Sequence, residues 1–228
     1  MNAFLTPAVL ARVVPFVLFM VFLALRGHWP ESLQAMLDAK WIYGIGVVVV
    51  SAAMYFYWPR YQELGKQAPR LGFGGWCLSV LVGVVVFYLW IKLDKPWMIL
   101  GEPTASPFQP VDEQGQLIWS LVLIRWVGAA LMVPLMEELF WRSYLMRWID
   151  QQDFEQFDPK AASYKAVALS TFAFMLAHTQ WLAAIVAGLA YAWLYKRTGS
   201  LWAPVVAHGV TNGVLGIWVV LMGNWAFW

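Results

Sequence analysis

Two adjacent glutamates and an arginine lie together in an apolar stretch of the sequence: Glu137, Glu138 and Arg142. An ionisable side chain inside a membrane costs at least about 2.5 kcal/mol on insertion scales, so it is a candidate for function. At helical spacing Glu138 and Arg142 share a face and can form an ion pair, whereas Glu137 is rotated about 100° away. Neighbouring carboxylates in a poorly hydrated site raise each other's proton affinity. The pattern predicts Glu137 as a general base and Glu138 as the structural partner of Arg142.

Two histidines and an asparagine form the second group of polar residues in apolar surroundings. His208 and Asn212 are four residues apart, so on a helix they present two N–H donors on one face. Such a pair can hold a developing oxyanion. His178 stands alone, and a lone histidine of this kind can equally be a packing residue. As an alternative, Glu137, His178 and His208 could ligate zinc and leave one position open for water, although the H-E-x-x-H signature is absent.

The elements that must position these groups are membrane helices. The chain is 61% hydrophobic and 12% charged, whereas soluble domains carry about 25% charged residues. Apolar runs of roughly 18 residues, the length that crosses a bilayer as a helix, recur along the whole sequence. The single cysteine, Cys77, excludes an internal disulfide. The sequence predicts an all-α polytopic membrane protein with one domain, residues 1–228, and a catalytic helix core over residues 117–222.

Seven spans are predicted, and an interfacial helix at Pro30–Leu37 would make eight. The spans are Ala8–Leu25, Trp41–Trp58, Leu71–Ile91, Leu117–Met136, Lys165–His178, Trp181–Tyr195 and Leu201–Met222. The fourth is expected to continue as helix to Trp148 with a bend at Pro134, because proline removes a helix hydrogen bond. If it does, Glu138, His178 and His208 lie about 14, 20 and 17 Å from one membrane side at 1.5 Å per residue.

Lysine and arginine are distributed unequally between the two sides of the predicted bundle. The richer side holds Arg60, Lys66, Arg70, Arg147, Lys160, Lys165, Lys196 and Arg197, and the other holds Arg26, Lys40, Lys92 and Lys95. Because cytoplasmic loops carry an excess of positive residues, the richer side is predicted to be cytoplasmic. The N-terminus is therefore expected inside. Arg125, alone in the fourth span, receives no role from the sequence.

Three ordered motifs resemble those of the CPBP superfamily, which holds the CAAX prenyl endoproteases and the bacteriocin-processing (ABI) proteins. They are Glu137-Glu138-x-x-x-Arg142, Phe174-x-x-x-His178 and His208-x-x-x-Asn212. The resemblance covers roughly Arg125 to Asn212. It implies a multi-helix membrane fold around a water-filled cavity open toward the cytoplasm, and glutamate-dependent hydrolysis of a peptide bond.

By residue, the resemblance implies that Glu137 activates water and that His178 shares this role. It implies that His208 and Asn212 stabilise the tetrahedral oxyanion. The structural support is assigned to three further residues: Glu138, Arg142 and Phe174. No cofactor is implied. The expected partners are the lipid bilayer and a peptide or protein substrate, with C-terminal and membrane-associated segments as options, and no nucleic acid.

A narrower resemblance is to a bacterial subgroup associated with exosortase systems. It rests on Asp38-Ala39-Lys40-Trp41-Ile42-Tyr43, Trp181-Leu182-Ala183, Arg197-Thr198-Gly199-Ser200-Leu201-Trp202 and Gly223-Asn224-Trp225-Ala226-Phe227-Trp228. It implies a Gram-negative inner membrane.

Three alternatives to a glutamate-dependent protease stay open: a zinc-dependent protease with the same residues, a non-catalytic immunity or scaffold protein, and a transporter with a proton relay. The transporter hypothesis lacks the paired half-repeats that such proteins often show. Substrate, cleavage site and oligomeric state are not determined by the sequence.

Overall fold

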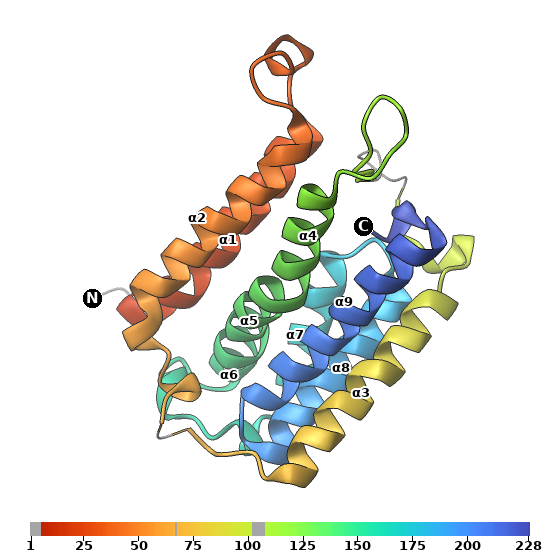
Figure 1. Ribbon diagram of the computed structural model, residues 1–228. Coiled ribbons are helices and arrows are strands. Elements are labelled where there is room, and N and C mark those ends of the chain that lie inside the picture. The colour runs from red at the N-terminus through yellow and green to blue at the C-terminus, as the bar shows by residue number, and fades with distance from the viewer. Residues whose placement is uncertain (1–5, 67, 102–107) are drawn as a thin grey trace.

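The computed structural model describes residues 6–66, 68–101 and 108–228, and in this part of the chain every long element is a helix (Figure 1). Seven helical segments run along the bundle: α1 Pro7–Gly27, α2 Ala39–Tyr57, α3 Phe73–Lys92, a segment from Trp119 to Asp150, α7 Tyr164–Leu176, α8 Trp181–Thr198 and α9 Trp202–Met222. The all-α polytopic fold is confirmed. The Pro30–Leu37 segment holds a single 3₁₀ turn, Glu31–Leu33, and not a further long helix.

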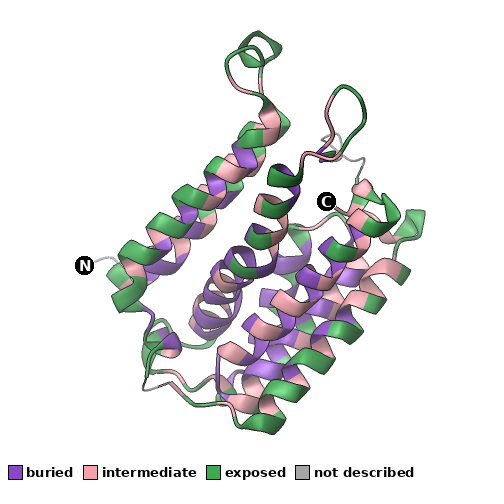
Figure 2. Ribbon diagram, in the orientation of Figure 1, coloured by how far each residue is buried: buried purple, intermediate pink, exposed green. Residues whose placement is uncertain are grey.

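Length and composition separate these segments into two groups. Among the described residues, five helices are long and apolar enough to cross a membrane: α1, α2 with its 3₁₀ extension to Arg60, α3, the Trp119–Asp150 segment and α9. The outward faces of α1, α2 and α3 carry many exposed residues (Figure 2), and large apolar side chains such as Val48, Phe56 and Leu81 are among them. Exposed apolar side chains on a helix that spans a bilayer are matched to lipid tails.

The segment Trp119–Asp150 is one continuous helical element with two wide turns. It consists of α4 Trp119–Val127, a π-helical turn Gly128–Met132, α5 Val133–Glu138, a longer π-helical stretch Leu139–Met146 and α6 Arg147–Asp150. Pro134 is the second residue of α5, just after the first wide turn, and it has no N–H to donate to the helical ladder. Glu137 and Glu138 thus sit between two π-helical stretches, a feature frequent at functional sites.

Close contacts fix α9 between its neighbours. The helix packs along α3, and α1 with α2 and α7 with α8 form two further pairs (Figure 1). A Cβ on Gly83 of α3 would lie 2.4 Å from the Ala207 carbonyl oxygen, and one on Gly209 would lie 2.8 Å from the Ala130 carbonyl oxygen. Only glycine fits such backbone approaches. They hold His208 and Asn212 of α9 beside the Trp119–Asp150 segment.

The bundle has two chemically different ends. We call one the basic end; its connections are residues 58–66, 68–72, 151–163 and 199–201. The opposite end, called the cavity end for the reason given below, has connections 28–38, 93–101, 108–118 and 223–228. Helix α1 begins at the basic end, so the described chain starts there.

A buried network of paired charges closes the basic end. Arg12 of α1 is 1% exposed, and its Nη2 lies 2.7 Å from Glu63 Oε2. Ser143 donates its hydroxyl proton to Glu63, and Arg147 Nη2 donates to the Ser143 hydroxyl at 2.7 Å. Burial would raise the pKa of Glu63, but the charge and hydrogen bonds of Arg12, with Ser143 and Arg147, bring it below the usual value. The sequence did not predict this network.

Candidate active site

One cavity of about 300 Å³ is lined by all four residues that the sequence nominates for catalysis. Glu137 reaches it from α5, His178 from the turn after α7, and His208 and Asn212 from α9. The remaining lining residues are Trp90, Arg125, Ala129, Val133, Phe174, Thr179, Gln180, Ala187, Tyr191, Thr211, Leu215, Ala226, Phe227 and Trp228. The tertiary structure therefore brings the three sequence motifs to one place.

The two glutamates have different environments. Glu138 is fully buried; Arg142 Nη1 donates to its Oε1 at 3.1 Å, and Arg142 Nε lies 3.1 Å from its Oε2. Glu137 is 8% exposed and lines the cavity, and its Oε2 has no hydrogen-bond partner among the described residues. A buried carboxylate oxygen without a partner is costly. Glu137 is therefore the carboxylate that a water or substrate could engage.

His178 lies two residues beyond α7, in the turn to α8, whereas the sequence placed it within the helix. Its backbone N–H donates to the Met175 carbonyl at 3.0 Å, so the helix ladder tightens and stops. The backbone N–H of His178 thus does not reach the Phe174 carbonyl, as it would in a continuing α-helix. The imidazole ring takes its place, with Nδ1 at 2.8 Å from the Phe174 carbonyl oxygen. A carbonyl only accepts, so Nδ1 carries the proton. In the neutral ring Nε2 then keeps a lone pair and can accept a proton.

His208 is held by two contacts that no sequence motif indicates. Its Nδ1 lies 2.9 Å from Glu138 Oε1, so Glu138 bridges His208 and Arg142. The Tyr191 ring stacks on the imidazole at a centroid distance of 5.0 Å, and the Tyr191 hydroxyl donates to Thr211 at 2.8 Å. With Nδ1 engaged by Glu138, Nε2 is the ring nitrogen left for a ligand. It donates only when the ring is doubly protonated.

Asn212 is oriented by the first π-helical turn. Its Nδ2 donates to the Ala129 carbonyl oxygen at 2.9 Å, a carbonyl within Gly128–Met132. An amide nitrogen carries two protons, so one N–H remains for a ligand in the cavity. The wide turn thus has a structural consequence at the site, because it presents a carbonyl that fixes the asparagine.

Phe174 connects the pieces of the site through its ring. The ring centroid is 4.3 Å from that of His178 and 4.6 Å from the Arg142 guanidinium carbon. Arg142 also lies 5.4 Å from the centroid of Tyr191. Its delocalised charge thus contacts two aromatic faces as well as Glu138, which stabilises a buried guanidinium.

The cavity residues Glu137, His178 and His208 are of types that can ligate a metal ion. Among residues 6–66, 68–101 and 108–228, no group of three or more His, Cys, Asp or Glu side chains lies close enough to hold one. A catalytic zinc site needs three protein ligands and an open position. Glu137, His178 and His208 as positioned do not fit that requirement, so no step of the mechanism below passes through a metal.

The cavity lies toward one end of the bundle. Its lining continues from Glu137 and His208 to Trp90, Gln180 and Trp228, which lie at or near the cavity end. None of the lining residues comes from the described connections of the basic end. The sequence predicted a cytoplasmic basic side and a cavity open to the cytoplasm. In this structure both expectations cannot hold, because the cavity and the basic connections lie at opposite ends of the bundle. The sequence alone does not show at which end the helices leave a cavity.

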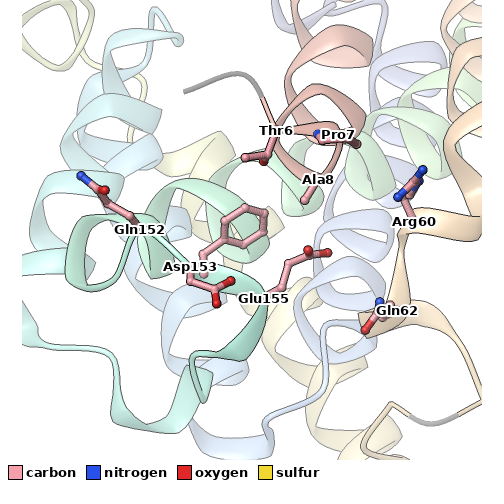
Figure 3. Close-up of a pocket in the computed structure, with 9 residues that line it drawn as sticks. Thr6, Pro7, Ala8, Arg60, Gln62, Gln152, Asp153 and Glu155 are labelled. Atoms are coloured by element: carbon pink, nitrogen blue, oxygen red, sulfur yellow. The ribbon is translucent and has the colours of Figure 1, made fainter. Parts of the chain in front are cut away.

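A separate pocket of about 450 Å³ lies at the basic end (Figure 3). Figure 3 shows the start of α1, Thr6 to Ala8, together with Arg60 and with the carboxylates of Asp153 and Glu155. Glu155 already pairs with Arg12 at 3.4 Å. Among the residues that the structure describes, the lining holds no histidine, cysteine or serine. Through Glu155, this pocket borders the network of paired charges that closes the basic end.

Residues 119–214 match the family model described as Type II CAAX prenyl endopeptidase Rce1-like. All three motifs, from Glu137 to Asn212, fall inside this segment. No curated protein and no solved structure gives a significant match. The narrower resemblance to exosortase-associated proteins stays a prediction. The segment that builds the cavity is therefore similar to the CAAX prenyl endopeptidases of the Rce1-like family.

Proposed function

We propose that this protein is an intramembrane endopeptidase that hydrolyses a peptide bond with a water activated by Glu137. The family match supports a membrane endopeptidase. The observation that carries the residue assignment is that Glu137 lines the cavity with His178, His208 and Asn212 and forms no ion pair with a described residue, whereas Glu138 pairs with Arg142 and His208. A general base must be within hydrogen-bond reach of the proton that it removes, directly or through one water.

The proposed reaction proceeds in two proton transfers. Glu137 takes one proton from a water in the cavity, and the resulting hydroxide attacks the peptide carbonyl carbon. His178 accepts a hydrogen bond from the same water at Nε2, which its bond to Phe174 leaves free. The C–N bond then breaks, and Glu137 returns its proton to the leaving amine. Water is the only co-reactant, and the products are a carboxylic acid and an amine, which exchange one proton to become a carboxylate and an ammonium.

The oxyanion of the tetrahedral intermediate is assigned to His208 and Asn212. Each has one contact that fixes it, to Glu138 and Ala129 respectively. Asn212 keeps a second amide N–H for the cavity, and His208 donates from Nε2 as the doubly protonated imidazolium, whose charge the Glu138 carboxylate balances. Donors held in place before the reaction stabilise developing charge without reorganisation. Glu138, Arg142 and Phe174 support this arrangement and do not contact the reacting atoms.

The test is cleavage of a quenched fluorescent peptide library by purified protein in detergent. Glu137→Gln keeps the side-chain shape and removes the base, so we expect a loss of about 10²–10⁴-fold in rate. The melting temperature should not fall, since an unpartnered buried charge has been removed. The matched control is Glu113→Gln, an exposed acid of the cavity end. Equal rates for Glu137→Gln and wild type would refute the assignment.

Two arms of the same assay address the alternatives. Loss of activity on chelation, with recovery on adding zinc, would replace the mechanism by a zinc-dependent one. Absence of cleavage across the library, with unchanged folding, would favour the non-catalytic scaffold hypothesis.

For the orientation we propose that the basic end lies in the cytoplasm, with the N-terminus inside, in a bacterial inner membrane. The described connections of the basic end carry Arg60, Lys66, Arg70 and Lys160, and positive loops stay cytoplasmic. The cavity then opens away from the cytoplasm. This revises the expectation of a cytoplasm-facing cavity, and the substrate segment would be taken from the extracytoplasmic side.

A further inference from the structure

The cavity contains a second ionisable group that the proposed reaction does not use. Arg125, on α4, lines the same cavity as Glu137. Its Nε and Nη1 atoms are buried and have no hydrogen-bond partner among the described residues. No described carboxylate lies within ion-pair distance of it. Burying a charged guanidinium without a hydrogen-bond acceptor costs free energy of folding, so a ligand that supplies an acceptor would offset this cost.

Three aromatic rings surround this guanidinium, but none of them supplies an oxygen acceptor for its N–H groups. The Arg125 guanidinium carbon is 4.6 Å from the Tyr43 ring centroid, 4.9 Å from that of Phe108 and 5.8 Å from that of Trp228. A cation–π contact places the charge near the face of an aromatic ring and does not require the N–H donors of the guanidinium. The N–H donors point outward in its plane, in the fork that matches a carboxylate.

A second arginine lies beside the first. Arg26 of α1 is 5.6 Å from the centroid of Phe108, and its buried Nε also has no partner among the described residues. Asp112 and Glu113 follow Phe108 closely in the chain, yet neither belongs to an ion pair of the described residues. Two cations that share one aromatic ring repel each other, and an anion between them would offset that repulsion.

We propose that Arg125, assisted by Arg26, binds a carboxylate of the peptide substrate. The proposal rests on the proposed function, because it places the substrate in the cavity of Glu137. Arg125 precedes Glu137 by twelve residues on one helical segment, which is about 18 Å along the axis. An extended peptide covers that distance with roughly five residues. The site thus selects peptides with a negative charge a few residues from the bond that is cleaved.

The test separates binding from cleavage by using Glu137→Gln protein in detergent. The probes are three dansylated apolar decapeptides: a free acid, a carboxamide, and a carboxamide with one internal Asp. We expect at least one charged probe to bind about ten-fold or more tightly than the neutral carboxamide, as charge-assisted hydrogen bonds permit. Arg125→Gln should abolish this preference and Arg125→Lys should retain part of it. Arg60→Gln, an exposed arginine at the basic end, is the matched control and should retain all of it.

Equal affinity of the three probes for the Glu137→Gln protein would overturn the proposal, even if Arg125→Gln failed to fold. Displacement of the charged probe by phosphatidylglycerol in the detergent, with no preference among peptides, would assign the arginines to a lipid phosphate and would also overturn it. A charge preference without any cleavage by the wild-type protein would uphold the anion site and refute the proposed hydrolysis.

Discussion

Buried arginines occur at both ends of this bundle, but their partners differ. At the basic end, Arg12 and Arg147 meet Glu63 and Ser143 in a closed network. At the cavity end, Arg125 meets only aromatic rings among the described residues. The same side-chain type is therefore neutralised in one region and left available in the other.

The two kinds of buried arginine can serve different purposes, one in stability and the other in binding. A paired guanidinium holds helices together, and removing one partner leaves the other charge stranded. An unpaired guanidinium contributes less to the fold and can accept an external anion.

The largest effect is expected at Glu138, which lies between the two ends and bridges Arg142 and His208. Glu138→Ala strands a buried guanidinium and frees the imidazole, so the loss of unfolding free energy should be about 3–5 kcal/mol. Activity should fall with it. The check is melting temperature beside cleavage rate.

The matched comparison pairs Arg142→Ala with the double variant Glu138→Gln, Arg142→Met. The double variant leaves no unpaired charge, so it should be more stable than Arg142→Ala. Equal melting temperatures would show that the ion pair does not control stability.

The second prediction compares one arginine from each end. Arg12→Ala leaves Glu63 with its more distant partner Arg147, at 3.9 Å, and should cost about 3 kcal/mol. Arg125→Gln loses only cation–π contacts and should cost roughly 1 kcal/mol. Melting temperatures in one detergent decide the order. A reversal of that order would mean that Arg125 is a structural brace and would contradict the distinction between the ends.

The third prediction uses the lowered pKa of Glu63. Its folded pKa lies below the unfolded value of about 4.3, held there by Arg12 against the opposing effect of burial. The stabilisation is therefore present above about pH 4.3 and disappears as the pH falls through the lower folded pKa. Melting temperature between pH 6 and 3 should decline less steeply, on the order of half the slope, in Glu63→Gln than in wild type. Parallel curves would exclude Glu63 as a source of acid sensitivity.

The smallest effect on the protein is a labelling pattern that reports orientation. In a Cys77→Ser background, single cysteines at Lys66 and Lys160 mark the basic end, and one at Thr179 marks the cavity lining. A membrane-impermeant maleimide should modify the Thr179 position in intact spheroplasts and the other two only in inverted vesicles. The opposite pattern would place the cavity mouth in the cytoplasm and reverse the proposed orientation.

Much of the helical architecture was predictable because it depends on local patterns. Apolar runs of bilayer length gave the positions of α1, α2, α3 and α9 to within a few residues, since backbone hydrogen bonds inside a membrane must be satisfied within each segment. The Glu138–Arg142 contact likewise follows from a spacing of four residues. The π-helical stretches were not predictable. Their N–H groups bond one residue further back than in an α-helix, and residue types and apolar periodicity do not show this difference.

The sequence by itself determined which groups are available: two acids, two histidines, an asparagine and a surplus of cations on one side. The tertiary structure alone decided their partners. His208 meets Glu138 across 70 positions of the chain, and Arg12 meets Glu63 across 51. Such contacts depend on which segments pack against one another. Helical periodicity shows which residues share a face of one helix, but it does not show which neighbouring segment that face contacts. For the same reason only the folded bundle shows that the cavity lies at the end away from the basic connections.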